Sequence, residues 1–391
     1  MSKFHYVIFS RLEKLGESKW NQLTTRESFY LSYPWLQTYP GSEAYTPFYI
    51  LVLDKSETPV AAVPCYLIKN PDFYAPYNVY DLFFQNLSDI CREDCFPMLL
   101  CGTRSAYTNA VLWHSHLTMR QMQEAGQLIR DAVRELVEQW NVKLTGFLYL
   151  TPQAAQTLVD CCLLDNPLVV TAANCKLILD FPDFQSYLDR FRSRRRWDIR
   201  RQIRRFEMSG YDVKRLPLSE CMDMLVPLFL NLQHRYGHST THDSAENMFL
   251  NQIRWLNELS VVYLCLSKDK PVGFCLFFRW KQSLYARVAG FDYDNLQNDF
   301  CYFNLVYYLP ILDALREGIR EIHYGTTAYD AKIKRGCLLE PAWSTIYSTG
   351  FWKGPNIISQ LRIQQQEKLE EWAGLARHWG LGNLDHWRMD K

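Results

Sequence analysis

The sequence predicts an α/β protein of two domains, each a mixed, twisted sheet flanked by helices. Three observations predict this class: the chain length, a hairpin pattern that occurs twice, and a strand–helix–strand order after each hairpin. The chain has 391 residues, of which 48% are hydrophobic and 15% aromatic. A single core stops growing near ~250–300 residues, so a chain of this length and composition has material for two cores.

The repeated hairpin is the first evidence for a duplicated unit. Apolar residues from Tyr49 lead into a polar turn and then into a β-branched second arm that runs to Val63. The segment from Val262 to Phe278 has the same layout, and in both hairpins the second arm opens with Pro-Val and a small residue. Two such hairpins in comparable places indicate two copies of one unit.

A strand, a helix and a second strand follow each hairpin, which is the order of a crossover unit in an α/β layer. Pro310 interrupts the later helix, so we expect a kink or a late helix start there. The expected segments are 96–101, 118–140 and 144–150 in the first half, and 284–290, 303–317 and 321–325 in the second.

We place the domains at 1–180 and 181–355, with the second domain opening on a basic helix. Residues 356–391 read as an amphipathic helix and a tail, which we interpret as a packing or capping helix. The first residues carry charge and no apolar core of a signal peptide, and no stretch of about 18 apolar residues occurs. We therefore expect no transmembrane segment and a cytoplasmic protein.

A cytoplasmic location predicts that the 12 cysteines are thiols, and their spacing fits no zinc pattern. His234, His238 and His242 recur every four residues, which is one turn of a helix. Gly237 and a Ser-Thr-Thr run make a continuous helix there unfavourable, so we expect no metal site.

The basic helix is the strongest local charge feature. Nine arginines lie between Arg190 and Arg205 in a chain whose formal net charge is +1. Arg196, Arg200 and Arg204 fall one turn apart, and guanidinium groups bind phosphate in bidentate pairs. The alternative interpretation is a solvated face with acidic neighbours. As a phosphate site, the helix would suit a tRNA acceptor end, CoA or a nucleotide-linked substrate equally.

The C-terminal half carries an ordered set of glycines around one lysine. A helical stretch ends in Gly318, a strand ends in Gly325, and a loop leads to Lys332, four residues before Gly336. This order and spacing resemble the C-terminal half of Fem-like GNAT proteins, which include the Fem aminoacyltransferases and bacterial peptidoglycan biosynthesis proteins. The resemblance covers about 181–350, and it implies tandem GNAT-like domains that transfer an acyl group to an amine.

Two further segments match the same group, and two positions depart from it. The arginine-rich helix before Gly210 and the strand 284–290 followed by Tyr302 agree with it. His323 stands where many relatives have an acidic residue; it could act as a base or be a satisfied strand-end histidine. The glycine loop that binds the CoA pyrophosphate in simple GNAT enzymes is absent. The segment that begins at Arg287 matches that loop only in part.

The resemblance implies that Lys332 faces the reacting carbonyl, where an ammonium would stabilise the oxyanion of the transition state. The alternative is an exposed loop lysine. The missing CoA loop favours aminoacyl-tRNA over acyl-CoA as donor, with no tightly bound cofactor and an amine-bearing acceptor. Acyl-CoA-dependent acylation of a small-molecule or lipid-linked amine, and a non-catalytic GNAT-like binding protein, remain open. The expected site residues are Lys332 and His323 (catalytic), Arg196, Arg200, Arg204 and Arg287 (donor phosphate), and Tyr302, Asn304, Tyr324, Gly325 and Gly336 (substrate).

Overall fold

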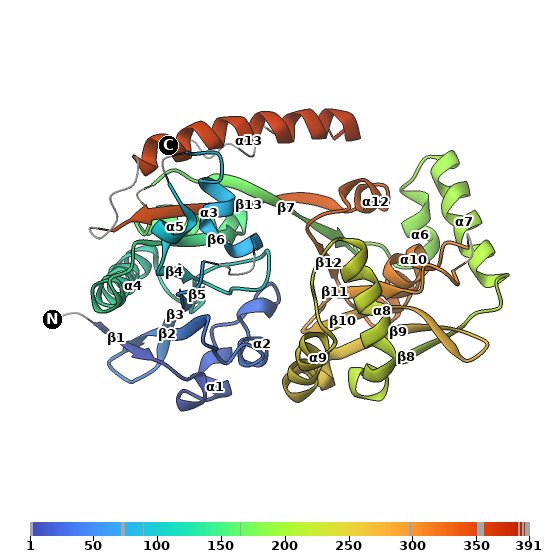
Figure 1. Ribbon diagram of the computed structural model, residues 1–391, viewed down its shortest axis with the longest axis horizontal. Helices are drawn as coiled ribbons and strands as arrows, with labels where there is room; N and C mark the ends of the chain where they lie inside the picture. The colour runs from blue at the N-terminus through green and yellow to red at the C-terminus, as the bar shows by residue number, and fades with distance from the viewer. Residues whose placement is uncertain are drawn as a thin grey trace. The chain divides into compact units, whose positions relative to one another are not determined.

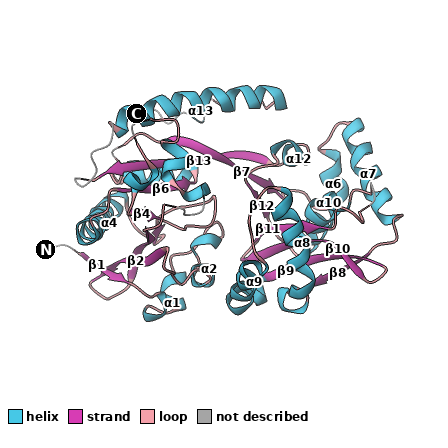
Figure 2. Ribbon diagram, in the orientation of Figure 1, coloured by secondary structure: helices cyan, strands magenta, loops and turns pink. Residues whose placement is uncertain are grey.

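The computed structural model describes residues 3–71, 75–88, 90–164, 166–296, 299–349, 356–381, 384 and 387. The chain divides into two compact units: unit 1 comprises 1–174 and 339–391, and unit 2 comprises 175–338. Figures 1 and 2 show the order of helices and strands along the chain. The predicted tail after the last helix falls largely outside the described residues.

The unit boundaries differ from the predicted ones at 180 and 355. Strand β13 (Leu338–Ser348) lies within the predicted second domain, yet it pairs antiparallel with β6 (Leu144–Leu150) of unit 1. Strand β7 (Val169–Ile178) changes unit at Cys175. A strand returns to an earlier domain through backbone hydrogen bonds that carry little local sequence signal, so the pattern of the sequence did not reveal this exchange.

Unit 1 has a mixed sheet in the order β1-β2-β3-β4-β6-β13-β7, with β5 paired to β3. The first hairpin, β2–β3, is antiparallel as predicted, and β4 and β6 are the predicted parallel pair. Besides β6, β7 and β13, whose bounds are given above, the strands and helices of unit 1 are β1 (Phe4–Phe9), α1 (Glu17–Asn21), α2 (Tyr33–Gln37), β2 (Tyr45–Asp54), β3 (Pro59–Ile68), α3 (Val79–Phe83), β4 (Met98–Cys101), β5 (Leu112–Trp113), α4 (Met119–Trp140), α5 (Pro152–Asp160) and α13 (Ile357–Trp379).

Helix α4 shows how the local sequence sets an element of unit 1. Its N-terminus has a capping box, in which Thr118 accepts from the Gln121 backbone and the Gln121 side chain returns to Thr118. Its C-terminus is Asn141 in the left-handed conformation. Ala125, Ile129 and other small or apolar residues form its buried face, which packs on β1, β2 and β3. The predicted range 118–140 is therefore confirmed.

Unit 2 has the strand order β7-β12-β11-β10-β9-β8. The second hairpin, β9–β10, is antiparallel, and β11 and β12 are parallel, both as predicted. Helix α8 packs on β10, β11 and α9. The elements of unit 2 are α6 (Phe184–Asp189), α7 (Ser193–Glu207), β8 (Asp212–Leu216), α8 (Met222–Arg235), α9 (His242–Leu256), β9 (Ser260–Ser267), β10 (Lys270–Trp280), β11 (Ser283–Phe291), α10 (Cys301–Phe303), α11 (Leu309–Arg316), β12 (Glu321–Gly325) and α12 (Tyr329–Ile333).

The helix of the second crossover is irregular where Pro310 predicted a disturbance. It begins at α10, widens into a π-helical segment over Asn304–Tyr308, and continues as α11. Proline has no backbone N–H and its ring crowds the preceding turn, and the wider π turn accommodates both effects. The disturbance therefore takes the form of a π segment rather than a late start.

The C-terminal helix α13 supports the packing interpretation. Asn356 caps its first turn, and Gly380 follows its last turn in the left-handed conformation. Ile357 and Leu361 belong to a buried cluster that includes Phe83 of α3. No helix in the described part of the chain combines the length and apolar character needed to cross a membrane.

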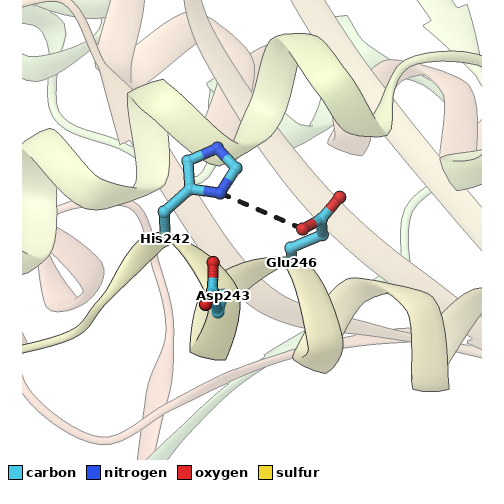
Figure 3. A group of neighbouring side chains, drawn as sticks. All are labelled: His242, Asp243 and Glu246. Atoms are coloured by element: carbon cyan, nitrogen blue, oxygen red, sulfur yellow. Dashed lines mark ion pairs between the residues drawn. The ribbon is translucent and has the colours of Figure 1, made fainter.

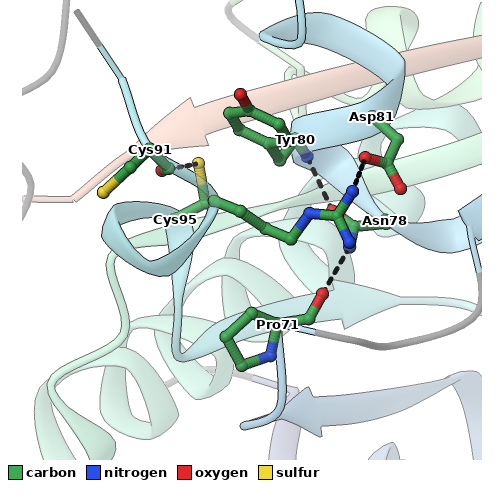
Figure 4. Close-up of polar contacts among 7 residues, drawn as sticks. Pro71, Asn78, Tyr80, Asp81, Cys91 and Cys95 are labelled. Atoms are coloured by element: carbon green, nitrogen blue, oxygen red, sulfur yellow. Dashed lines mark hydrogen bonds and ion pairs between the residues drawn. The ribbon is translucent and has the colours of Figure 1, made fainter.

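All twelve cysteines are free thiols. Cys91 and Cys95, the pair spaced four apart, lie at a short 3₁₀ turn (Arg92–Cys95) that Cys91 precedes and Cys95 ends, and the Cys95 thiol points at the Cys91 carbonyl (Figure 4). Beside them, Arg92 pairs with Asp81 at 2.7 Å, and Asn78 caps α3 while donating to the Pro71 carbonyl. These contacts hold a loop of unit 1 together and serve a structural role.

Candidate active site

The end of β12 and the start of α12 form a tight loop in unit 2. Gly325, Thr327 and Ala328 all have positive φ angles, of 65°, 65° and 45°. Two of these are not glycines, and such residues pay a steric cost in this region unless other contacts hold them. The contacts that hold this loop come from one lysine.

The ammonium of Lys332 is the centre of the loop. Its Nζ donates to the backbone oxygens of Tyr324 at 2.7 Å, Gly325 at 3.1 Å and Thr326 at 2.6 Å. The side chain is only 6% exposed. An ammonium has three donors, so these carbonyls engage all of them. The alternative of an exposed loop lysine is excluded, and in this conformation Lys332 fixes the loop shape.

Burial lowers the pKa of Lys332, while the neighbouring thiols Cys175 and Cys337 act in the opposite direction. Burial also raises the pKa of Cys175 to about 11, so that thiol stays protonated at neutral pH. A protonated, buried thiol is a poor nucleophile. The groups nearest the ammonium therefore provide no covalent catalyst.

One turn after Lys332 lies a second buried cation, Arg335, which the sequence analysis did not single out. It is 2% exposed, and its guanidinium donates to the Ala331 carbonyl at 2.8 Å and to Gln202 Oε1 at 3.0 Å. The guanidinium lies over the ring of Phe303, 3.6 Å from its centre. Among the described residues no carboxylate pairs with it, and its Nε has no hydrogen-bond partner.

Gln202 of α7 joins the π segment to this cation. Its Oε1 accepts from both Arg335 and the Tyr308 hydroxyl, and its carbonyl accepts from Asn304 Nδ2 at 3.3 Å. Asn304 is 2% exposed, and its amide also donates to the Phe300 carbonyl. The predicted substrate residue Asn304 is thus occupied in holding α7 against the π segment.

Tyr324 and Tyr302 lie in the aromatic layer around the π segment. The Tyr324 ring lies 4.8 Å from Tyr307, and its buried hydroxyl has no partner among the described residues. Burial raises the pKa of Tyr324 well above its ordinary value. Tyr302 contacts the ring of Phe291 at 5.7 Å. The unpartnered hydroxyl of Tyr324 is thus enclosed in the core of unit 2.

His323 faces away from this layer, because adjacent residues of a strand project to opposite sides of the sheet. Its ring stacks on Tyr285 at 4.3 Å, and its Nε2 lies 3.1 Å from Glu321 Oε1. Ser283 donates to the same oxygen at 2.7 Å. Burial opposes ionisation of Glu321, but these hydrogen bonds and the His323 charge lower its pKa to about 2. The geometry fits the satisfied strand-end histidine better than a free base.

The predicted phosphate residues lie on two elements. Arg196 approaches Asp189 at 3.5 Å, Arg200 donates to Gln185, and Arg204 is exposed with no ion pair among the described residues. Arg287 is on β11, where the register against β10 shifts by one residue, so it is the extra residue of a β-bulge. A fifth arginine, Arg195, donates to the Lys334 carbonyl at 2.8 Å and thereby ties α7 to α12.

The two predicted glycines have different surroundings. Gly325 has φ +65° and open space at the position of a Cβ. Gly336 has φ +82°, and a Cβ there would come within 3.3 Å of the Phe191 ring. Both positions favour glycine because of the left-handed conformation, and a side chain at Gly336 would in addition require the Phe191 ring to shift slightly.

The histidine row of the sequence analysis does not form one helix face, because α8 ends at Arg235 and α9 begins at His242. His242, Asp243 and Glu246 lie together on the first turns of α9 (Figure 3), with their possible ligand atoms within 4.8 Å of one another. The group is mostly exposed, and His242 and Glu246 are 4.0 Å apart. This is the ordinary geometry of an i, i+4 surface pair.

Unit 1 contains a cavity of about 290 Å³. Its walls come from the loop after α1, the segment 108–115, and the first turns of α4 and α5. The sequence analysis predicted no site residue there. The sequence signal was weak, since polar and apolar residues from the four contributing parts of the chain meet only in the folded unit.

Comparison with known proteins adds a family and a fold. A family model, FemAB_like, described as peptidoglycan biosynthesis/recognition, matches residues 11–371. FemX has a similar structure, with a TM-score of 0.58, 10% identity, and coverage of 87% of this chain and 97% of FemX. The C-terminal domain of a putative lysylphosphatidylglycerol synthetase from Agrobacterium fabrum is also similar, with a TM-score of 0.52, 8% identity, and coverage of 90% and 95%. Comparison with curated proteins finds no match.

These structural likenesses, at low identity, show the fold, and they agree with the mixed sheets and flanking helices of both units. The predicted α/β class, with mixed sheets flanked by helices, is thereby confirmed, and the family match confirms the resemblance to Fem-like proteins that the glycines around Lys332 suggested. Because the family match spans most of the sequence, the chain belongs to the FemAB_like family of peptidoglycan biosynthesis and recognition proteins.

Proposed function

We propose that the chain is a transferase that forms an amide bond by moving an acyl or aminoacyl group onto an amine of a peptidoglycan precursor. The observation that supports this most is the family match over residues 11–371. The buried ammonium of Lys332 at the end of β12 is a group that could stabilise negative charge in such a reaction. FemX, whose fold is similar, supports the same class of protein.

The chemistry is nucleophilic acyl substitution. A neutral amine of the acceptor attacks the carbonyl carbon of an ester or thioester, so that a C–N bond forms and the C–O or C–S bond breaks. The amine proton leaves with the released hydroxyl or thiol. Negative charge collects on the carbonyl oxygen in the transition state, where a fixed cation lowers the barrier. No covalent enzyme intermediate is required, which agrees with the protonated state of Cys175.

Lys332 has two tasks in this proposal. In the resting conformation it holds the loop 324–326 through three carbonyls. The bond to Gly325 is the longest of the three at 3.1 Å, and we propose that the reacting carbonyl oxygen replaces this acceptor. The two shorter bonds keep the ammonium in place during the exchange. Arg335, three residues further along the chain, adds a second buried positive charge to this part of unit 2.

The proposed donor is aminoacyl-tRNA. Six arginines of the basic segment have no carboxylate partner among the described residues: Arg192, Arg194, Arg195, Arg200, Arg204 and Arg205. Uncompensated guanidinium groups attract phosphates. An RNA donor supplies many phosphates, whereas a CoA donor supplies few.

The test uses the full chain, a radiolabelled aminoacyl-tRNA and a peptidoglycan precursor that carries a free amine. The expected result is transfer of label to the precursor, and loss of this transfer when ribonuclease is added first. A parallel reaction contains labelled acetyl-CoA in place of the tRNA. Transfer from acetyl-CoA alone, insensitive to ribonuclease, would assign the acyl-CoA-dependent alternative instead.

A Lys332→Ala variant tests the non-catalytic alternative. If the chain only binds a precursor, this variant retains precursor binding and no transfer is measured for either protein. If the chain is a transferase, the variant loses transfer while the wild type shows it. Lys334→Ala serves as the matched control, because Lys334 lies two residues away and is exposed, and its ammonium pairs with Asp330 at the surface.

A further inference from the structure

The outward surface of α7 combines positive charge with exposed aromatic and apolar side chains. Trp197 is 55% exposed, although large aromatic residues are usually buried. Arg194, Arg201, Arg204 and Met208 recur around it at helical spacing and share this surface. The position of α7 in unit 2 can be followed in Figure 1.

Four of the side chains at this surface form an alternating row of aromatic and guanidinium groups, which we call the stacking row: Trp197, Arg201, Phe300 and Arg205. The Arg201 guanidinium lies 5.1 Å from the centre of the Trp197 ring. Arg201 and Arg205 each lie 5.7 Å from the centre of the Phe300 ring. Cation–π contacts of this kind hold the planar groups in fixed positions.

The charge around the stacking row is not balanced. The segment from Phe184 to Gly210 contains nine arginines and three carboxylates. Two of these carboxylates pair with arginines at 3.5 Å, Asp189 with Arg196 and Asp198 with Arg201. Arg205 contacts only the ring of Phe300 among the described residues, so its charge is available to an anion.

The combination of exposed aromatic groups and unbalanced arginines distinguishes between three anionic partners: duplex nucleic acid, a membrane surface and single-stranded nucleic acid. A duplex presents phosphates and hides its bases, so exposed aromatic groups would gain nothing from it. A membrane surface requires a broad apolar face. Trp197 and Met208 are the exposed large apolar residues of this surface, and eleven helical residues separate them by about 16 Å. Single-stranded nucleic acid uses both features, because its phosphates bind arginines and its unpaired bases stack on aromatic rings.

We propose that the stacking row is a binding site for single-stranded nucleic acid, with a base on the exposed ring of Trp197 and phosphates on the arginines that the Phe300 ring holds in position. The inference deepens the proposed function, and it rests on that function in one respect. If the donor is aminoacyl-tRNA, then the strand bound here is the unpaired 3′ end of that tRNA.

The first measurement is binding of the full chain to a 5′-labelled single-stranded RNA of twelve nucleotides, followed by fluorescence anisotropy at several salt concentrations. The same RNA as a blunt duplex, and vesicles of phosphatidylglycerol and phosphatidylcholine, are the comparison ligands. We expect Trp197→Ala to weaken single-strand binding roughly 5- to 100-fold, the range for loss of one stacked base. Trp197→Phe restores most of the affinity, since a ring is again present.

The second measurement uses Arg205→Gln. Loss of one phosphate contact on a single strand lowers the slope of log K against log salt by about 0.7. Arg254→Gln is the matched control, because Arg254 of α9 also stacks on a tryptophan, Trp255, at 5.4 Å but lies outside the basic segment. The control is expected to leave both affinity and slope unchanged.

The inference is overturned if the single strand binds no more tightly than the duplex, if Trp197→Ala leaves its affinity unchanged, or if only the vesicles bind. These results are separable from failure of the proposed function. Suppose that Trp197→Ala still transfers from aminoacyl-tRNA with an unchanged KM for tRNA. This result would reject the stacking row as a binding site and would support the transferase function. If the chain binds the single strand but transfers nothing from tRNA, the stacking row is supported and the proposed transfer from aminoacyl-tRNA is rejected.

Discussion

The guanidinium of Arg335 lies 3.6 Å from the centre of the Phe303 ring, in a buried environment where no described carboxylate neutralises it. Burying a charge without a counter-ion costs several kcal/mol, and an apolar residue of similar size often serves stability equally well. Arg335 follows Lys332 by three residues in the chain, and we expect its charge to contribute to the potential of the site in addition to its hydrogen bonds with Ala331 and Gln202.

Arg335→Met tests this interpretation. We expect the free energy of unfolding in urea to change by less than about 2 kcal/mol, because the apolar side chain fills the space on Phe303. Transfer activity should fall at least tenfold, because the positive potential at the end of β12 decreases. A methionine variant that unfolds, or one that remains fully active, would contradict the assignment. Arg335→Lys, which keeps charge without the planar stack, reports the packing contribution separately.

Lys332→Met removes the ammonium and keeps the chain length. Three carbonyls lose their donor, so the loop 324–326 is destabilised by about 1–3 kcal/mol in chemical unfolding. If the ammonium also contacts the oxyanion, kcat falls roughly 10²- to 10³-fold in assays at the same temperature as the wild type. Lys334→Met should leave both quantities unchanged, since that side chain is exposed. A kcat equal to the wild type in a folded Lys332→Met protein would remove the catalytic role.

Tyr324→Phe removes a buried hydroxyl that has no described hydrogen-bond partner. Deleting an unsatisfied polar group relieves its desolvation cost, so thermal stability should stay the same or rise by about 1 kcal/mol. A drop in transfer activity in this more stable variant would show that the hydroxyl binds substrate. Unchanged activity would restrict Tyr324 to the packing against Tyr307.

The ion pair of Glu321 and His323 predicts a pH dependence of stability. The pKa of Glu321 in the folded chain is about 2, below its ordinary value of 4.5. The ionised carboxylate therefore adds stability above pH 4.5, and this contribution is lost as the pH falls from 4.5 toward 2. Urea unfolding of Glu321→Gln should show lower stability at pH 7 and a shallower decline in that window. Identical acid limbs for both proteins would contradict the assignment.

Two glycine variants separate backbone strain from side-chain contact. Gly325→Ala forces a positive φ on alanine in open space, which costs about 1–2 kcal/mol. Gly336→Ala incurs the same strain and also crowds the Phe191 ring at 3.3 Å, so its loss of stability should be larger. Thermal unfolding of the two proteins measures the difference. Equal losses would mean that Phe191 moves aside without cost.

The sequence by itself determined most of the local elements. Both hairpins, the helix 119–140 and the two parallel strand pairs follow from apolar periodicity, turn residues and capping signals that act over a few residues. The glycines around Lys332 also indicated the family, because each marks a backbone conformation that other residues rarely adopt. Pro310 marked the irregular turn for the same kind of local reason.

Only the tertiary structure decided how these elements combine. The return of β13 to β6 and the layer of Gln202, Asn304 and Arg335 depend on contacts between residues far apart in the chain. The side chains of His323 and Tyr324 point to opposite sides of the sheet because both residues belong to strand β12. Long-range hydrogen bonds and packing leave no periodic trace in the sequence, so the predicted roles of Asn304 and His323 could not be distinguished from structural ones before the fold was known.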